Sequence, residues 1–410
     1  MDLPLPNDLL PLVDVDTAPV VTEELSDCLD ELLRELRIAV RARVALLPPS
    51  SPSTSSYSST SPLTSIERKA RIAVLFSGGL DCTTLALIAA DELDPSESID
   101  LINVAFENPR VLAGDRTLDE GKKEPRRKRV RQKGRRTEET LVEEVATVEE
   151  AVKKPKAMYD VPDRLTGYES YAELKRLRPD RRWNFVEVNV TYEEMLGCRD
   201  KVIELMRPAR TIMDLVGHSF YHRAESFTDK FAGSQSISLA FYFAARSHGS
   251  LSSPNSPSTP YTSTAKILLS GLGADELFGG YARHRKTFFY SPPTPPSPHA
   301  PYLALLAELQ MDLDRLPYRN LGRDDRVISS HGKEARYPFL AGNVVETVVR
   351  VKVWLKCDMR FAEGVGDKLM LRALAGRLGL EGARGLKKRA IHFGARTAVS
   401  HLSSKIMIVD

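Results

Sequence analysis

Residues 72–82 combine a short apolar run, paired glycines and a carboxylate, a combination suited to phosphate chemistry. The apolar residues 72–76 predict a parallel strand that is buried on both faces. Gly78 and Gly79 then let the backbone approach an anion at the start of a helix. A carboxylate cannot bind phosphate directly, so Asp81 is predicted to hold Mg²⁺, which in turn binds the phosphates.

A second segment, residues 267–281, repeats the order of strand, glycine turn, acidic pair and helix. Its residues 270–281 read SGLGADELFGGY, and residues 77–82 read SGGLDC. Together these two runs resemble the synthetase domain of the asparagine synthetase family. Further segments fit a divergent branch of the same family: 161–167, 182–190, 318–326, 331–340, 366–372 and 387–394. The resemblance covers most of residues 67–398, apart from the inserts described below.

The resemblance implies an α/β fold, namely a Rossmann-like parallel sheet of the adenine nucleotide alpha-hydrolase type with helices on both faces. The two glycine loops would then lie at the carboxyl ends of neighbouring parallel strands, where open α/β sheets bind their ligands. In that arrangement Asp275 lies opposite Asp81.

The family's reaction defines the expected cofactors and substrates. Mg²⁺ and ATP adenylate a carboxylate, which is aspartate in the family, and pyrophosphate leaves; ammonia then displaces AMP. By resemblance, Asp81 and Asp275 bind the metal, and Lys368 is the catalytic lysine that contacts pyrophosphate. The residues expected to bind ATP or pyrophosphate are Phe76, Ser77, Gly78, Gly79, Asp81, Cys82, Ala105, Ser270 and Gly271.

Two features depart from the family pattern. Where active members have a glutamate that serves as general base, this chain has Leu272, and the loss of a positioned base typically costs about 10²–10⁴-fold in rate. The glutamine amidotransferase domain with its N-terminal cysteine is also not recognised here, since residue 2 is Asp2. We therefore expect ammonia to come from solution or from an amidotransferase partner in trans.

Three functions remain open on the sequence alone. The first is an amidating enzyme of the asparagine synthetase type, without its own glutaminase. The second is a catalytically degenerate nucleotide-binding scaffold or regulator, which Leu272 favours. The third is an ATP pyrophosphatase that modifies tRNA, and the lack of paired catalytic cysteines argues against it.

The predicted organisation is an N-terminal helix and Pro/Ser-rich linker in residues 1–66, followed by the synthetase-like domain in 67–410. Leucines and valines at helical spacing in 25–44 predict the helix, and Thr22 is suited to cap it. Residues 99–106 and 185–190 predict strands, and a capping box at Thr191 starts a helix that ends near Met206.

Four inserts are expected, near 110–157, 216–235, 250–264 and 291–301, the last two as surface loops. The first contains a basic run, but acidic residues follow it and no aromatic residues interrupt it. Nucleic-acid binding is therefore not favoured.

Length and composition agree with a large α/β enzyme domain, and no membrane span is expected. The chain has 410 residues, is 42% hydrophobic and carries a formal net charge of +3. Its four cysteines show no metal-binding spacing, which favours a reducing compartment. No apolar run approaches the roughly 20 residues of a transmembrane helix. With no signal-peptide pattern at the N-terminus, we expect a cytoplasmic location.

Overall fold

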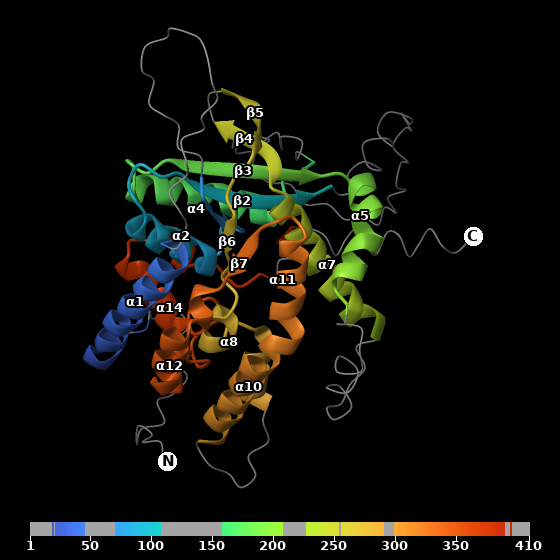
Figure 1. Ribbon diagram of the computed structural model, residues 1–410. Helices are drawn as coiled ribbons and strands as arrows, with labels where there is room; N and C mark the ends of the chain where they lie inside the picture. The colour runs from blue at the N-terminus through green and yellow to red at the C-terminus, as the bar shows by residue number, and fades with distance from the viewer. Residues whose placement is uncertain are drawn as a thin grey trace, which may run out of the picture.

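The computed structural model describes residues 21–45, 70–107, 158–207, 227–253, 256–290 and 299–389, and the single positions 19, 394 and 395. A seven-stranded sheet in the order β5-β4-β3-β2-β1-β6-β7 runs through this part of the chain (Figure 1). Strands β3, β2, β1, β6 and β7 are joined by parallel pairings. The strands are β1 (Ile72–Leu75), β2 (Ile99–Phe106), β3 (Trp183–Val190), β4 (His248–Ser253), β5 (Ser256–Thr262), β6 (Ile267–Leu269) and β7 (Glu334–Arg336).

The hairpin of β4 and β5, at one edge of the sheet, was not predicted from the sequence. Residues 250–264 were predicted to be a surface loop within a parallel sheet, but β4 pairs antiparallel with β3, and β5 pairs antiparallel with β4. These two strands are rich in serine, threonine and proline, so they lack the apolar alternation by which a strand is recognised in the sequence. Proline is compatible with an edge strand, where one row of backbone groups needs no partner, and Pro260 lies in β5. The hydroxyl of Tyr261 donates to the buried carboxylate of Asp100, at 3.0 and 3.1 Å from its oxygens, and ties the hairpin to β2.

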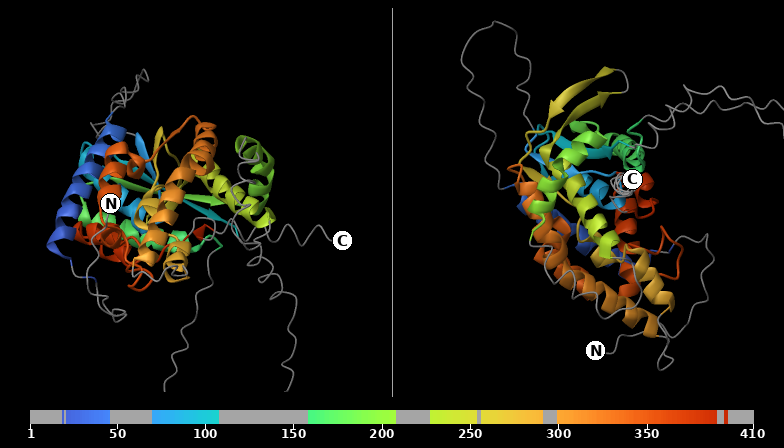
Figure 2. Two further views of the ribbon diagram at one scale, coloured as in Figure 1. Left: turned by 90° about the horizontal axis from the view of Figure 1, so that it is seen from below. Right: turned by 90° about the vertical axis from the view of Figure 1, so that its right-hand side faces the viewer.

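Helices cover both faces of the sheet (Figure 2). On one face, Ile72 and Val74 of β1 pack in a core shared with α1 (Glu23–Val44), α2 (Leu80–Glu92) and α14 (Leu369–Arg377). On the other face, Ala73 and Leu268 pack with α5 (Tyr192–Leu205), α7 (Phe227–Arg246) and α11 (Gly322–Ser329). The alternation of side chains along each strand produces this division. The mixed α/β architecture with helices on both faces is therefore as expected.

The remaining helices are α4 (Pro162–Leu177), α8 (Ala274–Phe278), α9 (Ala282–Tyr290), α10 (Ala300–Leu316), α12 (Gly342–Arg350), α13 (Val353–Lys356) and α15 (Glu381–Arg384), together with a π-helical turn (Pro317–Leu321) and a 3₁₀ turn (Pro338–Leu340). Of these, α4, α8, α12 and α15 contribute to the same core as α1, α2 and α14, and α10 lies below the sheet in Figure 1. Helix α4 packs against β2 and α2, and α14 packs against α2. These contacts place the amino ends of α2, α4 and α14 near one edge of the sheet.

The N-terminal helix is confirmed. Thr22 caps α1, because its hydroxyl accepts a hydrogen bond from the amide of Leu25 at 3.2 Å. Leu29, Leu32 and Leu36 are almost completely buried, so α1 is packed into the core of the domain. The capping of α5 by Thr191 is confirmed as well, through the amide of Glu194 at 3.1 Å.

The other predicted inserts lie largely outside the described residues. This holds for 110–157, for 216–226 and for 291–298, and also for the linker after residue 45. Residues 227–235, which the sequence assigned to an insert, form the first part of α7.

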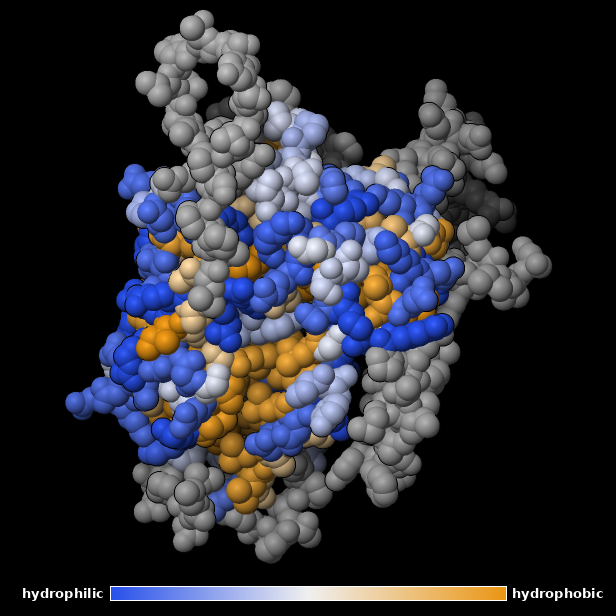
Figure 3. All heavy atoms as spheres, in the orientation of Figure 1, coloured by the Kyte–Doolittle hydropathy of each residue, from blue (hydrophilic) through white to orange (hydrophobic). Residues whose placement is uncertain are grey.

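The surface in the orientation of Figure 1 is mainly hydrophilic over the sheet, and hydrophobic residues gather in a hollow below it, near α8 and α10 (Figure 3). None of the described helices combines the length and the apolar character needed to cross a bilayer.

Candidate functional site

The loop after β1 is held tightly by α4. Gly78 has φ +78°, and a Cβ at this position would lie 2.4 Å from the backbone of Thr166. The hydroxyl of Thr166 donates to the carbonyl of Ser77 at 2.9 Å, and that of Ser170 donates to the carbonyl of Gly78 at 2.6 Å. Because a side chain at Gly78 would be both strained and obstructed, only glycine fits there.

Cys82 lies in the first turn of α2 beneath this loop. Its sulfur is 3.6 Å from the hydroxyl of Ser77 and donates to the carbonyl of Gly79 at 3.3 Å. Burial raises the pKa of the Cys82 thiol, so Cys82 acts as a weak neutral donor in the loop. Gly79 is the N-cap of α2 and leaves the amino end of this helix open.

Two carboxylates and a lysine meet where the two glycine loops converge. Lys368 Nζ lies 2.7 and 2.6 Å from the two carboxylate oxygens of Asp81, and 2.7 Å from Oδ1 of Asp275. Lys388 binds the other carboxylate oxygen of Asp275. The structure thus brings together the predicted residues Asp81, Asp275 and Lys368, which we call the charge centre.

Neighbouring charges favour the ionised forms of Asp275 and Lys368. Burial acts against ionisation of Asp275, but Lys368 and Lys388 outweigh it and hold the pKa of this carboxyl well below its ordinary value. Burial likewise acts against the Lys368 ammonium, yet Asp275 and Asp81 raise its pKa above the ordinary value. Removal of one partner from such a buried ion pair strongly lowers the free energy of unfolding, because the other charge is left buried and unpaired.

Lys368 is held in a strained backbone conformation. It is one of two non-glycine residues with positive φ in the described chain, at +54°, and it stands at the N-cap of α14. Its amide donates to the carbonyl of Phe278 at 2.9 Å. Strain of this kind tends to persist at functional sites, where the surroundings impose it.

Gly280 provides the space for the charge centre. A Cβ at this position would lie 2.0 Å from Asp275 Oδ1 and 2.3 Å from Lys368 Cε. We therefore expect Gly280→Ala to lower the free energy of unfolding by about 1–3 kcal/mol, measured by urea denaturation. The matched control is Gly342→Ala, because an added Cβ at Gly342 meets no atom within 4 Å. Equal stability of the two variants would contradict this assignment.

The second glycine loop lies directly beside the first. Strand β6 pairs with β1, and a Cβ on Gly271 would lie 2.9 Å from the Cβ of Asp81. Leu272 donates its amide to the hydroxyl of Ser270 at 3.3 Å. Glu276 shapes the turn into α8 by accepting from the hydroxyl of Tyr281 at 2.6 Å and from the amide of Gly273 at 3.1 Å.

Phe76 and Ala105, the remaining predicted nucleotide contacts, are buried near the carboxyl ends of β1 and β2. The amide of Phe76 donates to the carbonyl of Ile102 at 2.9 Å, and its ring packs edge-on against Phe185. The amide of Phe106, next to Ala105, donates to the carbonyl of Ala395 at 3.1 Å. Residues 394 and 395 therefore lie along the end of β2.

The sequence did not predict a buried polar network beside this edge. Arg164 is 1% exposed; its guanidinium binds Glu187 at 2.9 Å, the side-chain oxygen of Asn103 at 2.7 Å and that of Asn189 at 2.8 Å. Asn103 in turn donates to the carbonyl of Phe76 at 2.8 Å. The available signal was the position of Asn103, Glu187 and Asn189 in otherwise apolar strands.

Asp163 and Lys388 were also missed as site residues. Asp163 lies in the first turn of α4, and a Cβ on Gly394 would lie 1.9 Å from its carboxylate, so residue 394 covers it. Burial raises the pKa of Asp163 to about 7, against the opposing effect of Arg389 and Lys388. Lys388 belongs to a basic run, residues 387–389, for which the sequence offered only family resemblance.

The raised pKa of Asp163 has a measurable consequence for stability. Because the folded protein holds this proton up to about pH 7 and the unfolded chain releases it near pH 4, the wild type loses stability as the pH rises between these values. Asp163→Asn lacks this loss. The difference in the free energy of unfolding between Asp163→Asn and wild type should therefore change in favour of the variant by on the order of 3 kcal/mol between pH 4 and pH 7. Above pH 7 this difference should stay constant. Urea denaturation across this range tests it, and parallel pH curves would contradict it.

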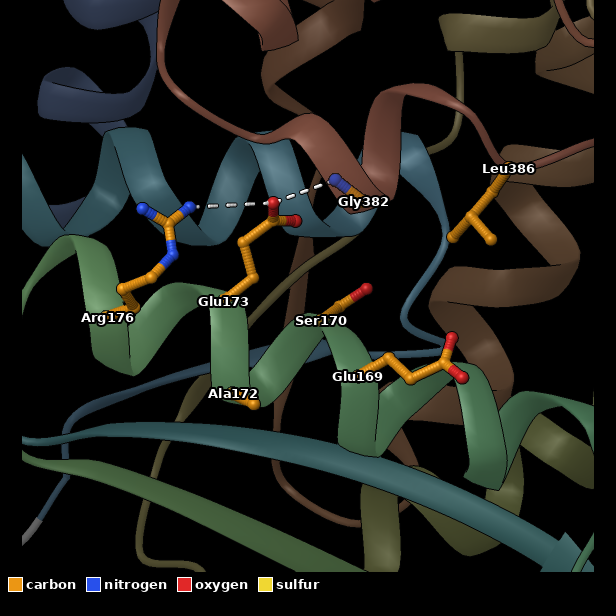
Figure 4. A pocket seen from close by; sticks show the side chains of 7 residues that line it. All are labelled: Glu169, Ser170, Ala172, Glu173, Arg176, Gly382 and Leu386. Carbon is orange, nitrogen blue, oxygen red and sulfur yellow. Dashed lines mark hydrogen bonds and ion pairs between the residues drawn. The ribbon is translucent and has the colours of Figure 1, made fainter.

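A separate pocket of about 340 Å³ lies between α4 and α15 (Figure 4). Glu173 accepts hydrogen bonds there from the amides of Gly382 and Ala383, at 2.8 and 3.1 Å. None of the predicted nucleotide-binding residues lines the pocket. Among its lining residues, Ser170 is the one whose hydroxyl also donates to the carbonyl of Gly78 in the loop after β1.

The charge centre fits Mg²⁺. The ion usually binds one or two carboxylates together with phosphate oxygens and waters, and Asp81 and Asp275 converge on a single point of positive charge, Lys368 Nζ. These two carboxylates would hold the metal. Lys368 and Lys388 would then be available to phosphate oxygens.

Comparisons with known proteins indicate the family of this chain. The asparagine synthase family model matches residues 261–303 and 294–381. The chain is 36% identical over 380 residues to asparagine synthetase domain-containing protein 1 of Homo sapiens and 38% identical over 381 residues to the protein of the same name in Gallus gallus. These alignments cover 91% and 92% of the chain and 52% of each relative, so the chain spans about half the length of the curated relatives it matches.

A further match is more local. A putative glutamine-hydrolyzing asparagine synthetase of Methanocaldococcus jannaschii is 40% identical over 91 residues, which cover 22% of this chain and 15% of that protein. The chain therefore carries an asparagine synthase domain and belongs to the asparagine synthetase family, with similarity along most of its length to the asparagine synthetase domain-containing proteins.

Proposed function

We propose that this domain uses Mg²⁺ and ATP to adenylate a carboxylate, with release of pyrophosphate, and then transfers the acyl group to ammonia. The observation that carries the proposal is the convergence of Asp81 and Asp275, from two glycine loops on adjacent parallel strands, on Lys368. Aspartate is the acceptor that family membership suggests. We also propose that the α/β fold is of the adenine nucleotide alpha-hydrolase type. The proposed location of the protein is the cytoplasm.

The residues of this chain divide the work. The backbone of Ser77, Gly78 and Gly79, with the open amino end of α2, binds the pyrophosphate part of ATP. Bound Mg²⁺ neutralises charge on the phosphates. Lys368 and Lys388 stabilise the leaving pyrophosphate as point charges. Phe76, Ala105, Ser270 and Gly271 supply backbone groups for the AMP part.

Adenylation is tested by exchange of labelled pyrophosphate into ATP, measured with Mg²⁺ and a panel of carboxylates that includes aspartate. We expect exchange in the wild type that is lost on chelation of Mg²⁺ and in Asp81→Asn and Asp275→Asn. The matched control is Asp91→Asn, which removes a surface carboxylate paired with Arg178. Failure of every carboxylate to support exchange would contradict the proposal.

A nucleotide-binding scaffold is the second candidate, and Leu272 is the observation that favours it. Leucine cannot accept a proton from the attacking ammonia. Under this alternative, calorimetry would detect Mg²⁺-dependent ATP binding by a protein that catalyses no exchange.

The source of ammonia, either from solution or from an amidotransferase partner in trans, is a separate proposal. It is tested by adding candidate partners, together with glutamine, to the amidation assay.

A further inference from the structure

Amide formation requires a proton acceptor that the glycine loops do not supply. Residues 271–273 carry no ionisable side chain. Asp81 and Asp275 are both bound to Lys368, and Glu276 already accepts from Tyr281 and Gly273. Each of these carboxylates is therefore committed to a structural partner or to the metal.

Asp163 lies at the same edge of the sheet, and its carboxylate has no hydrogen-bond partner or ion pair within 3.5 Å among the described residues. The side-chain amide of Asn103 donates both to the carbonyl of Phe76, at 2.8 Å, and to that of Asp163, at 2.9 Å. Asp163 therefore lies next to a residue assigned to the AMP part of the nucleotide. Its side chain is 8% exposed, and its nearest cation among the described residues is Arg389 Nη1 at 3.9 Å, beyond hydrogen-bond distance.

The position of Asp163 is fixed by the buried network around Arg164. The guanidinium of Arg164 is turned away from Asp163, toward Glu187, Asn103 and Asn189. Tyr168 adds a hydrogen bond to Glu187 at 2.7 Å. Asn103 joins this network to the backbone of Asp163, so the main chain that carries the carboxylate is fixed at this edge of the sheet.

We propose that Asp163 is the proton acceptor for the attacking ammonia, the role that Leu272 cannot perform. This assignment rests on the proposed function. In the step, the ammonia nitrogen forms a bond to the carbonyl carbon of the acyl-adenylate, and the bond from that carbon to the AMP oxygen breaks. One proton passes from nitrogen to the Asp163 carboxylate and then to solvent, leaving the amide and AMP.

The electrostatic surroundings suit this role. Burial raises the pKa of Asp163 to about 7, near the pH at which a base is most effective. Arg389 and Lys388 face it from the C-terminal segment and oppose the rise. Since the base must be deprotonated, amide formation at constant unprotonated ammonia should increase with pH up to about 7 and then level off.

The first test compares two rates in the full chain: pyrophosphate exchange, which needs no proton acceptor, and amide formation. Asp163→Asn should lower amide formation about 10²–10⁴-fold and leave exchange within about twofold. Glu169→Gln, an exposed carboxylate on the same helix, is the control and should change neither rate. A parallel fall of both rates would assign Asp163 a structural role and overturn the proposal.

The second test uses the pH profile, which a structural role would not move. Arg389→Gln removes the nearest cation, so the rising limb of amide formation should shift to higher pH, and Asp163→Asn should lack this limb. An unshifted limb, or equal amide formation by wild type and Asp163→Asn, would overturn the role of Asp163 while exchange persists. Absence of exchange in the wild type would instead overturn the proposed function, and this role with it.

Discussion

Replacement of Lys368 by methionine is expected to reduce pyrophosphate exchange by at least about 10²–10³-fold, because one positioned charge at the leaving group typically contributes this much. The same change should also destabilise the protein. Lys368 is 3% exposed and neutralises both Asp81 and Asp275. Removal of one partner from a buried ion pair costs about 3–5 kcal/mol.

Added Mg²⁺ should recover part of the stability lost in Lys368→Met, since the two carboxylates would bind the ion more readily without the lysine. Thermal unfolding with and without Mg²⁺ measures this recovery. Lys352→Met is the control, because Lys352 pairs with Glu24 at the surface at 2.7 Å, and such pairs contribute at most about 1 kcal/mol. An unchanged rate and an unchanged melting temperature in Lys368→Met would show that the charge centre is not a functional site.

The sequence predicted the centre of this fold well, because strand, glycine turn and helix leave a strong local signal. Residues 72–82 and 267–276 could be assigned in this way, and the structure pairs β1 with β6 and brings Asp81 and Asp275 together. The cap of α1 at Thr22 was equally visible, since it depends on neighbouring residues only.

Features that depend on distant residues were not predicted. Strand β7 has only three residues and pairs with β6 across more than sixty positions of the chain, so no periodicity marks it. Asn103 and Arg164 are likewise 61 positions apart. Their pairing could be recognised only once β2 and α4 were placed side by side. The contact of Lys388 with Asp275 has the same cause.

Leu272→Glu is expected to increase amide formation while pyrophosphate exchange changes little, because only the ammonia step needs a proton acceptor. The loop can accommodate the new side chain, since Leu272 is partly exposed and its backbone already bonds to Ser270. A carboxylate without a buried partner there keeps access to water, which limits the cost of its charge. Leu272→Gln is the control, as it adds similar volume without a base.

The increase should depend on whether Asp163 is present. If Asp163 already accepts the proton in the wild type, a second base at position 272 adds little there, on the order of a few-fold. In Asp163→Asn the same Leu272→Glu change should restore amide formation by about 10²-fold or more, since it supplies the missing group. Double-mutant analysis of the four proteins measures this coupling. Equal effects of Leu272→Glu in both backgrounds would mean that the two positions act independently, and that the proton of the attacking ammonia leaves by another path.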